Sequence, residues 1–169
     1  LKGRCYINTD KAYSCFPELV QCIRKHDMAD QIILKGEVKN TWIYDATEEL
    51  APDIAFLAVS YETDTALQIC AGRKIHYVGI EVVFDKDDAP VTDPAYIEMM
   101  HKNKKLLWVN PILFSLSRPL VGGHDDNASM LGDPDHGWGW LVDRGYDILQ
   151  TDWVTDCITY LKATERYYR

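Results

Sequence analysis

Six short apolar segments recur along the chain, and stretches with helical periodicity separate them. The apolar segments are rich in β-branched and aromatic residues and end at polar or glycine positions, which is typical of strands buried on both faces. Strands that alternate with helices indicate βα units in a parallel sheet. We therefore predict consecutive parallel strands near residues 5–10, 31–35, 54–60, 76–84, 105–110 and 147–151.

The stretches between these strands carry helix signals. Asp93 is a candidate N-cap, and Pro94 suits the first helical position after it. Weaker helical patterns cover residues 39–50 and 63–71. Apolar residues at helical spacing predict one helix after the first strand, with Pro17 in its first turn, and a last helix near the end of the sequence: Phe16, Leu19, Val20 and Ile23, and Trp153, Val154, Cys157, Ile158 and Leu161.

The number of units favours a TIM-barrel type of fold. Six βα units in 169 residues take about 28 residues each, whereas a complete (β/α)8 barrel needs about 250 residues. We therefore interpret residues 1–169 as a single α/β domain with about six units of an incomplete barrel. Its first and last strands should expose apolar flanks unless a missing N-terminal segment or a second copy of the chain covers them. An open doubly wound sheet is the alternative, although no GxGxxG loop follows the first strand.

The composition narrows the range of partners. The chain has 18 Lys and Arg residues against 26 Asp and Glu, and its formal net charge of −8 argues against nucleic acid and anionic lipid as partners. No uncharged apolar stretch reaches the length of about 18 residues that a membrane-spanning helix needs. The five cysteines show no CxxC spacing, so we predict buried thiols rather than a disulfide framework or a zinc site.

Residues 111–139 interrupt the regular pattern with a run rich in glycine, proline and aspartate. We predict a long connection that covers the mouth of the site, because barrels of this type keep their active sites on the loops after the strands. Within this connection His124 is a candidate substrate contact. The run His124-Asp125-Asp126 suits a cation or a substrate, and a solvated loop is its alternative interpretation.

Polar side chains stand at or near the ends of several predicted strands. They are Asn8, Asp10 and Lys11, Lys35, Glu81, Asn110, and Gln150 with Asp152. By the strand period of two, Asn8 and Asp10 share one face. A ring of carboxylates, amides and lysines that converges from successive strands suits a phosphate-containing ligand bound with a metal ion.

Each of these residues also has a simpler interpretation. The simpler roles are a helix cap for Asp10 and Asp152, a solvated side chain for Lys11 and Lys35, a lysine partner for Glu81, and a backbone partner for Asn110 and Gln150. The group Glu62-Thr63-Asp64 with the distant His76 looks like a catalytic set. Acids at the start of a helix stabilise its dipole, and we favour that role for them.

The motifs INTDKA, LWVN, GGHDD, WGWLVDRGYDILQTD and CITYLK resemble those of glycerophosphodiester phosphodiesterases in order and spacing, from Cys5 to Leu161. The resemblance implies a (β/α)8 barrel that hydrolyses a glycerophosphodiester to glycerol 3-phosphate and an alcohol. It implies two acid–base histidines and a divalent cation, Ca²⁺ or Mg²⁺, with Asp10 as a metal ligand. When the resemblance is combined with the positions at strand ends and in the long connection, the candidates for binding substrate are Glu81, Trp108, Asn110, His124 and Gln150.

The sequence also departs from the family pattern. The family's His-Arg-Gly motif does not occur, and the only Glu-x-Asp, at residues 62–64, lies too late in the chain. The match begins at the family's third strand, so the chain looks like the C-terminal three-quarters of such an enzyme, inactive as a fragment. The alternatives are a degenerate relative, a non-catalytic module that binds phosphate esters, or an unrelated α/β carbohydrate or nucleotide enzyme.

The resemblance also implies a lysine that neutralises the phosphate, two residues after the strand acid. That position, counted from Asp10, is Ala12. Lys11 is adjacent to the acid and should point to the other face. Because neighbouring strands lie only about 4.8 Å apart, Lys35 at the end of the second strand can reach the same place. We predict that Lys35 supplies the charge, with Lys11 as the alternative.

Overall fold

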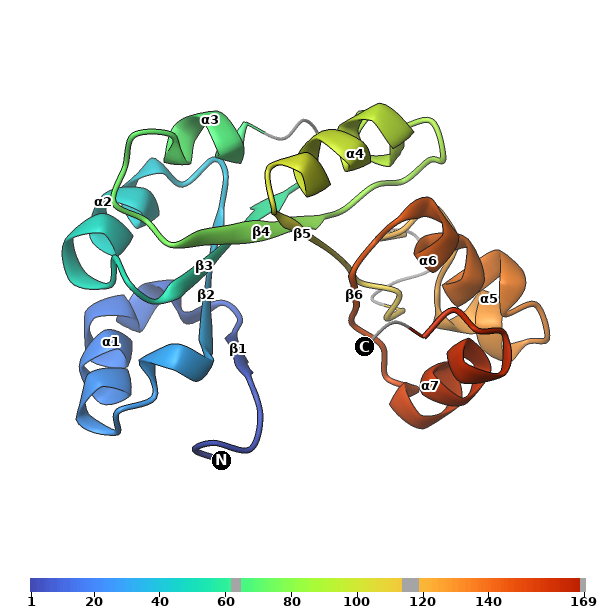
Figure 1. Cartoon of the computed structure of the whole chain (residues 1–169), viewed down its shortest axis with the longest axis horizontal. Helices are drawn as coiled ribbons and strands as arrows, with labels where there is room; N and C mark the ends of the chain where they lie inside the picture. The colour runs from blue at the N-terminus through green and yellow to red at the C-terminus, as the bar shows by residue number, and fades with distance from the viewer. Residues whose placement is uncertain (62–64, 114–118, 168–169) are drawn as a thin grey trace. The chain divides into compact units, whose positions relative to one another are not determined.

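The computed structural model describes residues 1–61, 65–113 and 119–167 (Figure 1). The chain divides into two compact units. The first unit holds the described residues up to Ile80 except Tyr61, and the second unit holds Tyr61 and the residues from Glu81 onward. We describe each unit by itself. The interpretation of residues 1–169 as a single domain stays a prediction.

Six strands form one sheet in the order of the sequence. They are β1 (Ile7–Thr9), β2 (Ile32–Glu37), β3 (Ala55–Ser60), β4 (Tyr77–Val82), β5 (Leu106–Val109) and β6 (Ile148–Leu149). The pairs β1–β2, β2–β3 and β5–β6 are parallel. The predicted α/β fold with consecutive strands is therefore confirmed, and the doubly wound alternative is wrong because that fold requires a reversal of strand order.

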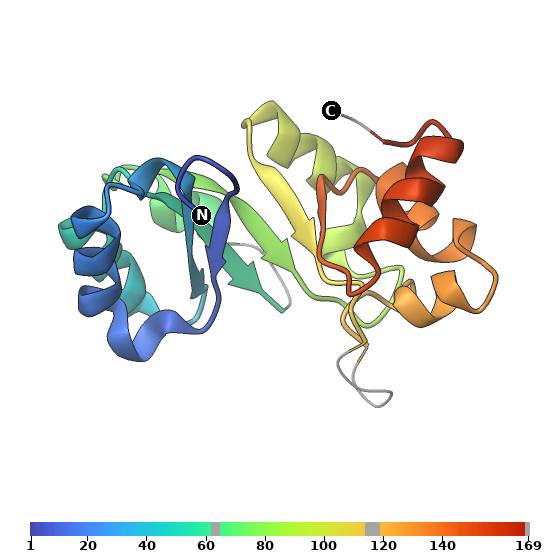
Figure 2. The same cartoon turned by 90° about the horizontal axis from the view of Figure 1, so that it is seen from below.

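Helices connect the strands, as the sequence pattern predicts. The first unit contains the 3₁₀ helices η1 (Ala12–Cys15) and η2 (Ala29–Gln31) and the α-helices α1 (Phe16–Lys25), α2 (Thr41–Leu50) and α3 (Ala66–Cys70). The second unit contains η3 (Pro90–Thr92), α4 (Pro94–Lys102), α5 (Asp126–Met130), the π-helical turn η4 (Asp135–Gly139), α6 (Trp140–Arg144) and α7 (Val154–Ala163). In Figures 1 and 2, α5, α6 and α7 gather in the second unit.

Local signals account for α1 and α4. Helix α1 has a proline in its first turn and buries Phe16, Val20 and Ile23 on one face, as its spacing predicts. At the start of α4 the side chain of Asp93 accepts a hydrogen bond of 2.8 Å from the backbone N–H of Ala95, which is the predicted cap. Both helices therefore begin where side-chain chemistry favours a helix start.

Helix α7 follows its predicted stripe only in part. Cys157 and Leu161 are buried, whereas Trp153 and Val154 are 48% and 56% exposed. The buried part joins Trp138 in the core of the second unit, and partly buried hydrophobic residues pack against it. The prediction of Asp152 as a helix cap is wrong, because the residue at the cap position is Trp153, with no side-chain capping bond.

The long connection after β5 is partly helical, because α5 and η4 lie within residues 111–139. Part of this connection runs alongside the segment that comes after β4, and Phe84 of that segment forms a parallel bridge with Val121. The backbone N–H of Phe84 donates to the carbonyl of Leu120, and the N–H of Gly122 donates to the carbonyl of Phe84. Within the second unit, the connection therefore lies at the carboxyl end of β4.

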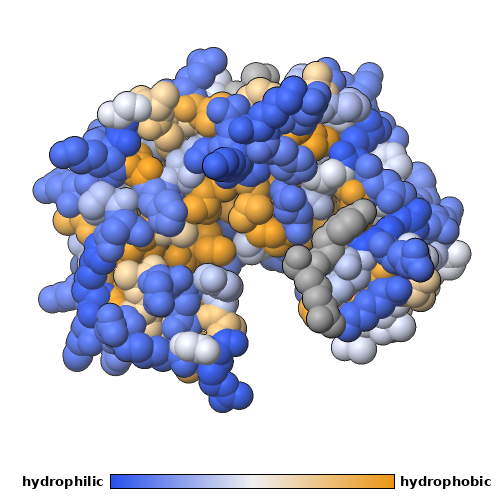
Figure 3. Space-filling view, in the orientation of Figure 1, coloured by the Kyte–Doolittle hydropathy of each residue, from blue (hydrophilic) through white to orange (hydrophobic). Residues whose placement is uncertain are grey.

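The surface and the thiols complete this description. The helices present mainly hydrophilic surface in Figure 3, in keeping with the net charge of −8. In the described ranges, none of the helices has the length and hydropathy of a membrane-spanning segment. Cys70 and Cys157 are buried as predicted. The prediction is wrong for Cys5, Cys15 and Cys22, which are exposed.

Candidate functional site

The first unit presents two different faces of its strands. A Cβ atom added at Gly36 would lie 3.0 Å from Cζ of Phe56 and would press on Ile43 of α2, so Gly36 faces that helix. Tyr44 of α2 also packs edge-on against Phe56, with ring centroids 5.4 Å apart. Because side chains alternate along a strand, Lys35 points to the opposite face from Gly36.

The register of β1 and β2 brings the predicted residues together on that opposite face. Asn8 pairs with Ile33, and Thr9 pairs with Leu34, so Asp10 and Lys35 are the next residues along the two strands. Asn8 and Lys35 therefore share one face, whereas Asp10 lies beyond the end of β1 and its place on that face stays a prediction. Lys35 is only 3% exposed, so the interpretation of Lys35 as a solvated side chain is wrong.

Asp10 and Lys11 lie just beyond the end of β1. The interpretation of Asp10 as a helix cap is wrong, because Lys11 stands at the cap position of η1 and Cys15 at that of α1, neither helix with a side-chain capping bond. Lys11 has a left-handed backbone with φ 54° and is exposed. A role for Lys11 in neutralising phosphate stays a prediction.

In the second unit, Glu81, Asn110 and Trp108 form a hydrogen-bonded chain. Asn110 donates from Nδ2 to Oε1 of Glu81 over 2.6 Å, and Trp108 donates from Nε1 to Oδ1 of Asn110 over 2.9 Å. Glu81 and Asn110 are each 7% exposed, and Trp108 is 8% exposed. The structure thus joins three of the predicted site residues at the carboxyl ends of β4 and β5.

Gln150 directly follows β6, and its backbone is hydrogen-bonded to the end of β5 and to the segment after it. Its N–H donates to the carbonyl of Val109 over 2.9 Å, and its carbonyl accepts from the N–H of Ile112 over 3.2 Å. The backbone of Gln150 thus holds the chain after β5 against the chain after β6. Its side chain is half-buried, and its proposed contact with substrate stays a prediction.

The side chain of His124 is buried and makes hydrogen bonds within the protein. It is 1% exposed, its Nε2 lies 2.8 Å from Oδ1 of Asp87, and its Nδ1 donates to the carbonyl oxygen of His136. Its ring stacks on Trp140 with centroids 3.8 Å apart and planes 4° apart. Both ring nitrogens are therefore engaged within the protein, and a substrate contact through His124 would require the bond to Asp87 to open.

The neighbours of His124 have structural roles that sequence reasoning missed. Asp125 caps α5 by accepting from the N–H of Ala128 over 3.0 Å. Asp126 is 2% exposed and accepts from Trp138 Nε1 over 2.8 Å, from Thr151 Oγ1 over 2.7 Å, and from the Asp152 N–H over 3.0 Å. Its carboxylate joins α5 to η4 and to the chain after β6. The interpretation of residues 124–126 as a solvated loop is wrong.

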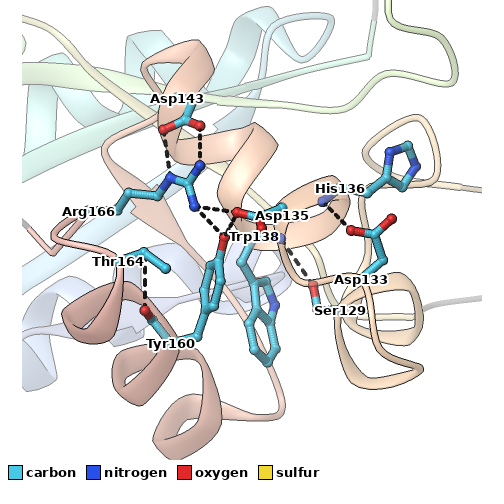
Figure 4. A network of polar contacts seen from close by, with 9 residues as sticks. All are labelled: Ser129, Asp133, Asp135, His136, Trp138, Asp143, Tyr160, Thr164 and Arg166. Atoms are coloured by element: carbon cyan, nitrogen blue, oxygen red, sulfur yellow. Dashed lines mark hydrogen bonds and ion pairs between the residues drawn. The ribbon is translucent and has the colours of Figure 1, made fainter.

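A second polar network ties the end of the chain to the helices before it (Figure 4). Arg166 donates to both carboxylate oxygens of Asp143, over 2.9 and 2.7 Å, and also to Asp135 and Tyr160. The Tyr160 hydroxyl donates to Asp135 over 2.6 Å. Hydrogen bonds from Tyr160 and Arg166 hold the pKa of Asp135 below its usual value, and burial raises the pKa of Tyr160 to about 12. The sequence offers no local signal for this network.

The group of residues 62–64 with His76, for which we favour a role at a helix start, is described only in part. Residues 62–64 lie outside the described residues, so the pair Glu62 and Asp64 is not placed. His76 contacts the backbone carbonyl of Asp53 through Nδ1 over 3.2 Å. Among the described residues, no three His, Cys, Asp or Glu side chains are close enough to hold a metal ion. The described residues thus do not by themselves fit the divalent cation that the resemblance implies.

A cavity of about 670 Å³ lies in the second unit, between β6 and the helices α6 and α7. Leu149, Val154 and Ile158 give it an apolar lining, with Arg166 and Asp147 among its polar residues. This cavity accords with an apolar flank beside the last strand. What covers that flank stays a prediction.

Comparison with known proteins places this chain in a family. None of the curated proteins compared with the chain matches it. Residues 56–161 match the model of DUF4996, which is described as a domain of unknown function. Because this match covers more than half of the 169 residues, the chain belongs to the DUF4996 family.

Proposed function

We propose that this protein binds a phosphate ester at the carboxyl ends of β1 and β2, and that it acts in the hydrolysis of glycerophosphodiesters to glycerol 3-phosphate and an alcohol. In this proposal the six parallel strands belong to a TIM-type (β/α)8 barrel. The observation that carries the proposal is the position of Lys35, which is 3% exposed and shares a strand face with Asn8.

The burial of Lys35 supports an electrostatic role. Lysine is among the residues that are least often buried, so a buried lysine at the end of a strand is a candidate for a specific interaction of its charge. The carboxyl ends of parallel strands are also where α/β barrels bind ligands. A phosphate at this edge would place its negative charge beside an ammonium group that is already held within the protein.

The hydrogen-bonded chain of the second unit supports the same class of ligand. Trp108 and Asn110 hold the Glu81 carboxylate in one orientation at the carboxyl end of β4. A fixed carboxylate accepts hydrogen bonds from hydroxyl groups, so the second unit by itself offers a binding group for a hydroxylated ligand. Because Glu81 and Asn110 come from different strands, the arrangement depends on the sheet and not on a flexible loop.

A divalent cation belongs to this proposal through the resemblance alone. The described residues bring no set of three ligating side chains together, so we derive no step through a cation. The acid–base histidines likewise enter this proposal through the resemblance alone, because the sequence has no His-Arg-Gly motif.

A binding experiment tests the role of Lys35. Calorimetric titration with glycerol 3-phosphate should show binding, and Lys35→Met should weaken it at least about tenfold, because a hydrogen bond to a charged group is lost. Lys25→Met is the matched control, since Lys25 lies exposed at the end of α1. Equal affinity of the Lys35→Met variant and the unchanged protein would contradict the proposal.

The second candidate function is a non-catalytic module that binds phosphate esters. The lack of a metal-ligating group among the described residues favours it. Release of glycerol 3-phosphate from glycerophosphocholine, measured with Mg²⁺ or Ca²⁺, separates the two candidates. Release that Lys35→Met abolishes supports the enzyme, whereas binding without release by the native protein supports the module.

A further inference from the structure

The amide oxygen of Asn8 is buried without a hydrogen-bond donor among the described residues. Buried polar atoms in folded proteins nearly always have a partner, because losing the hydrogen bonds of water without replacement is costly. An exception within a strand therefore calls for an explanation. Asn8 as a whole is only half-buried, although its amide oxygen has almost no exposed surface, so a ligand that reaches this oxygen must replace the groups that cover it.

The surroundings of Asn8 explain why the protein supplies no donor. Its register partner on β2 is Ile33, and the partner of Ile33 on β3 is Ala55. Paired residues of parallel strands point to the same face, so the two neighbours across the sheet present only aliphatic groups. Thr9, which follows Asn8, donates its hydroxyl proton to the carbonyl of Ile33 over 3.0 Å and is thus engaged elsewhere.

Lys35 lies on the same face as Asn8, two residues along the neighbouring strand. Neighbouring strands lie about 4.8 Å apart and each residue advances about 3.3 Å, so the two backbone positions are about 8 Å apart. A ligand that spans this distance offers an anion to the ammonium group of Lys35 and a hydrogen-bond donor to the amide oxygen of Asn8. A phosphate ester with a hydroxyl group three or four bonds from the ester oxygen has both groups.

We infer that the Asn8 amide oxygen accepts a hydrogen bond from a hydroxyl group of the bound ester, and so selects hydroxylated phosphate esters such as glycerol phosphate over alkyl phosphates. The inference rests on the proposed function, because it takes Lys35 as the phosphate-binding group. It assigns the ligand a hydroxyl donor and not an ammonium donor, because a cationic ligand group would lie close to the Lys35 ammonium.

The substitution Asn8→Leu tests this inference, because leucine has nearly the shape of asparagine without its polar atoms. Titrations would compare glycerol 3-phosphate, n-propyl phosphate, phosphoethanolamine and inorganic phosphate. The unchanged protein should prefer glycerol 3-phosphate over n-propyl phosphate about tenfold. Asn8→Leu should lose that preference and keep its affinity for inorganic phosphate, whereas Asn127→Leu, at an exposed position of α5, should keep both.

A second measurement separates ligand recognition from a structural role. If Asn8 serves a ligand, Asn8→Leu removes a buried oxygen that lacks a donor, and the melting temperature of the ligand-free protein should rise or stay the same. A structural hydrogen bond would make the same variant less stable. Asn8→Val, which suits a strand, provides a second variant if the leucine fails to fold.

The outcomes distinguish the inference from the proposed function. Binding of inorganic phosphate with no preference for glycerol 3-phosphate would overturn the role of Asn8 alone. A preference for phosphoethanolamine that Asn8→Leu abolishes would overturn the assignment of a hydroxyl donor. Failure of the unchanged protein to bind any of the phosphates would overturn the proposed function and this inference with it.

Discussion

Asn110 donates a hydrogen bond of 2.6 Å from Nδ2 to Oε1 of Glu81, a residue 29 positions earlier in the chain. The indole N–H of Trp108 can only donate, and it donates to the other end of the Asn110 amide. The amide orientation therefore follows from the chemistry of its two neighbours. This bond joins the ends of β4 and β5, so substitution of Asn110 measures how much the bond contributes to the stability of the candidate site.

Asn110→Leu should lower the free energy of unfolding by about 1–3 kcal/mol, because it removes one donor to a buried carboxylate and one acceptor from a buried indole. Urea denaturation measures the change. Asn103→Leu, at an exposed position, should change the stability by less than about 0.5 kcal/mol. Equal losses for Asn110→Leu and Asn103→Leu would contradict the prediction.

Gly139→Ala should destabilise the protein by about 1–3 kcal/mol, although its helical backbone (φ −60°, ψ −49°) would ordinarily favour alanine. The new Cβ would press on the Tyr160 hydroxyl and lie 3.2 Å from both Arg166 Nη1 and the Pro134 carbonyl. Thermal unfolding measures the effect. Tyr160→Phe removes the hydroxyl, so the double variant should lose less stability than the sum of the single variants. A Gly139→Ala variant that is more stable than the unchanged protein would refute this packing argument.

In the native protein, only the three exposed thiols should react with a disulfide reagent at pH 8. Cys5, Cys15 and Cys22 should react quickly, whereas Cys70 and Cys157 should react only after denaturation. Burial, with a smaller effect of Asp126, raises the pKa of Cys157 to about 12, so its thiolate is scarce at this pH. Cys70→Ala should leave the native thiol count unchanged, and Cys22→Ala should lower it by one. Rapid loss of five thiols from the folded protein would show that the buried positions open readily.

The ion pair between Asp53 and Arg24 should contribute to stability only above acidic pH. The Arg24 guanidinium lowers the pKa of Asp53 to about 2, against about 3.9 in an unfolded chain. The contribution is therefore complete above pH 4 and disappears as the pH falls toward 2. Because both side chains are about half exposed, it should amount to less than about 1 kcal/mol.

NMR titration of the Asp53 carboxyl group checks this prediction. In Arg24→Met the pKa of Asp53 should return toward its ordinary value, and the stability difference from the unchanged protein should vanish near pH 2. Arg73→Met, which removes contacts to Asp45 and Glu48 instead, should leave the pKa of Asp53 low. A stability difference that grows as the pH falls would contradict the assigned sign.

Much of the fold follows from local patterns. The strands β2, β3 and β4 and the helices α1 and α4 lie close to their predicted ranges, because apolar periodicity, proline placement and the Asp93 cap act within a few residues. β6 is shorter than predicted, with Ile148–Leu149 as its only paired residues. Strand ends depend on the neighbouring strand, and a single sequence does not carry that information.

The candidate site divides along the same line. Alternation along β1 predicts that Asn8 and Asp10 share a face, and the spacing between strands predicts that Lys35 can join them. The register puts Asn8 and Lys35 on one face, and the place of Asp10, beyond the end of β1, stays a prediction. The hydrogen bond from Asn110 to Glu81 is not visible in the sequence. It arises because β4 and β5 are neighbours in the sheet, so side chains at their carboxyl ends lie within hydrogen-bonding distance.

The amino-acid order, through periodicity and capping, was enough to establish an α/β chain with consecutive parallel strands and to select the strand ends as the places for chemistry. The roles of His124, Asp126 and Arg166 came only with the tertiary structure. Each of them bonds with residues at least 12 positions away, such as Asp87, Thr151 and Asp143. The physical reason is that a side chain pattern fixes local backbone preference over a few residues, whereas the partner of a buried polar group is chosen by which distant segments pack together and exclude water.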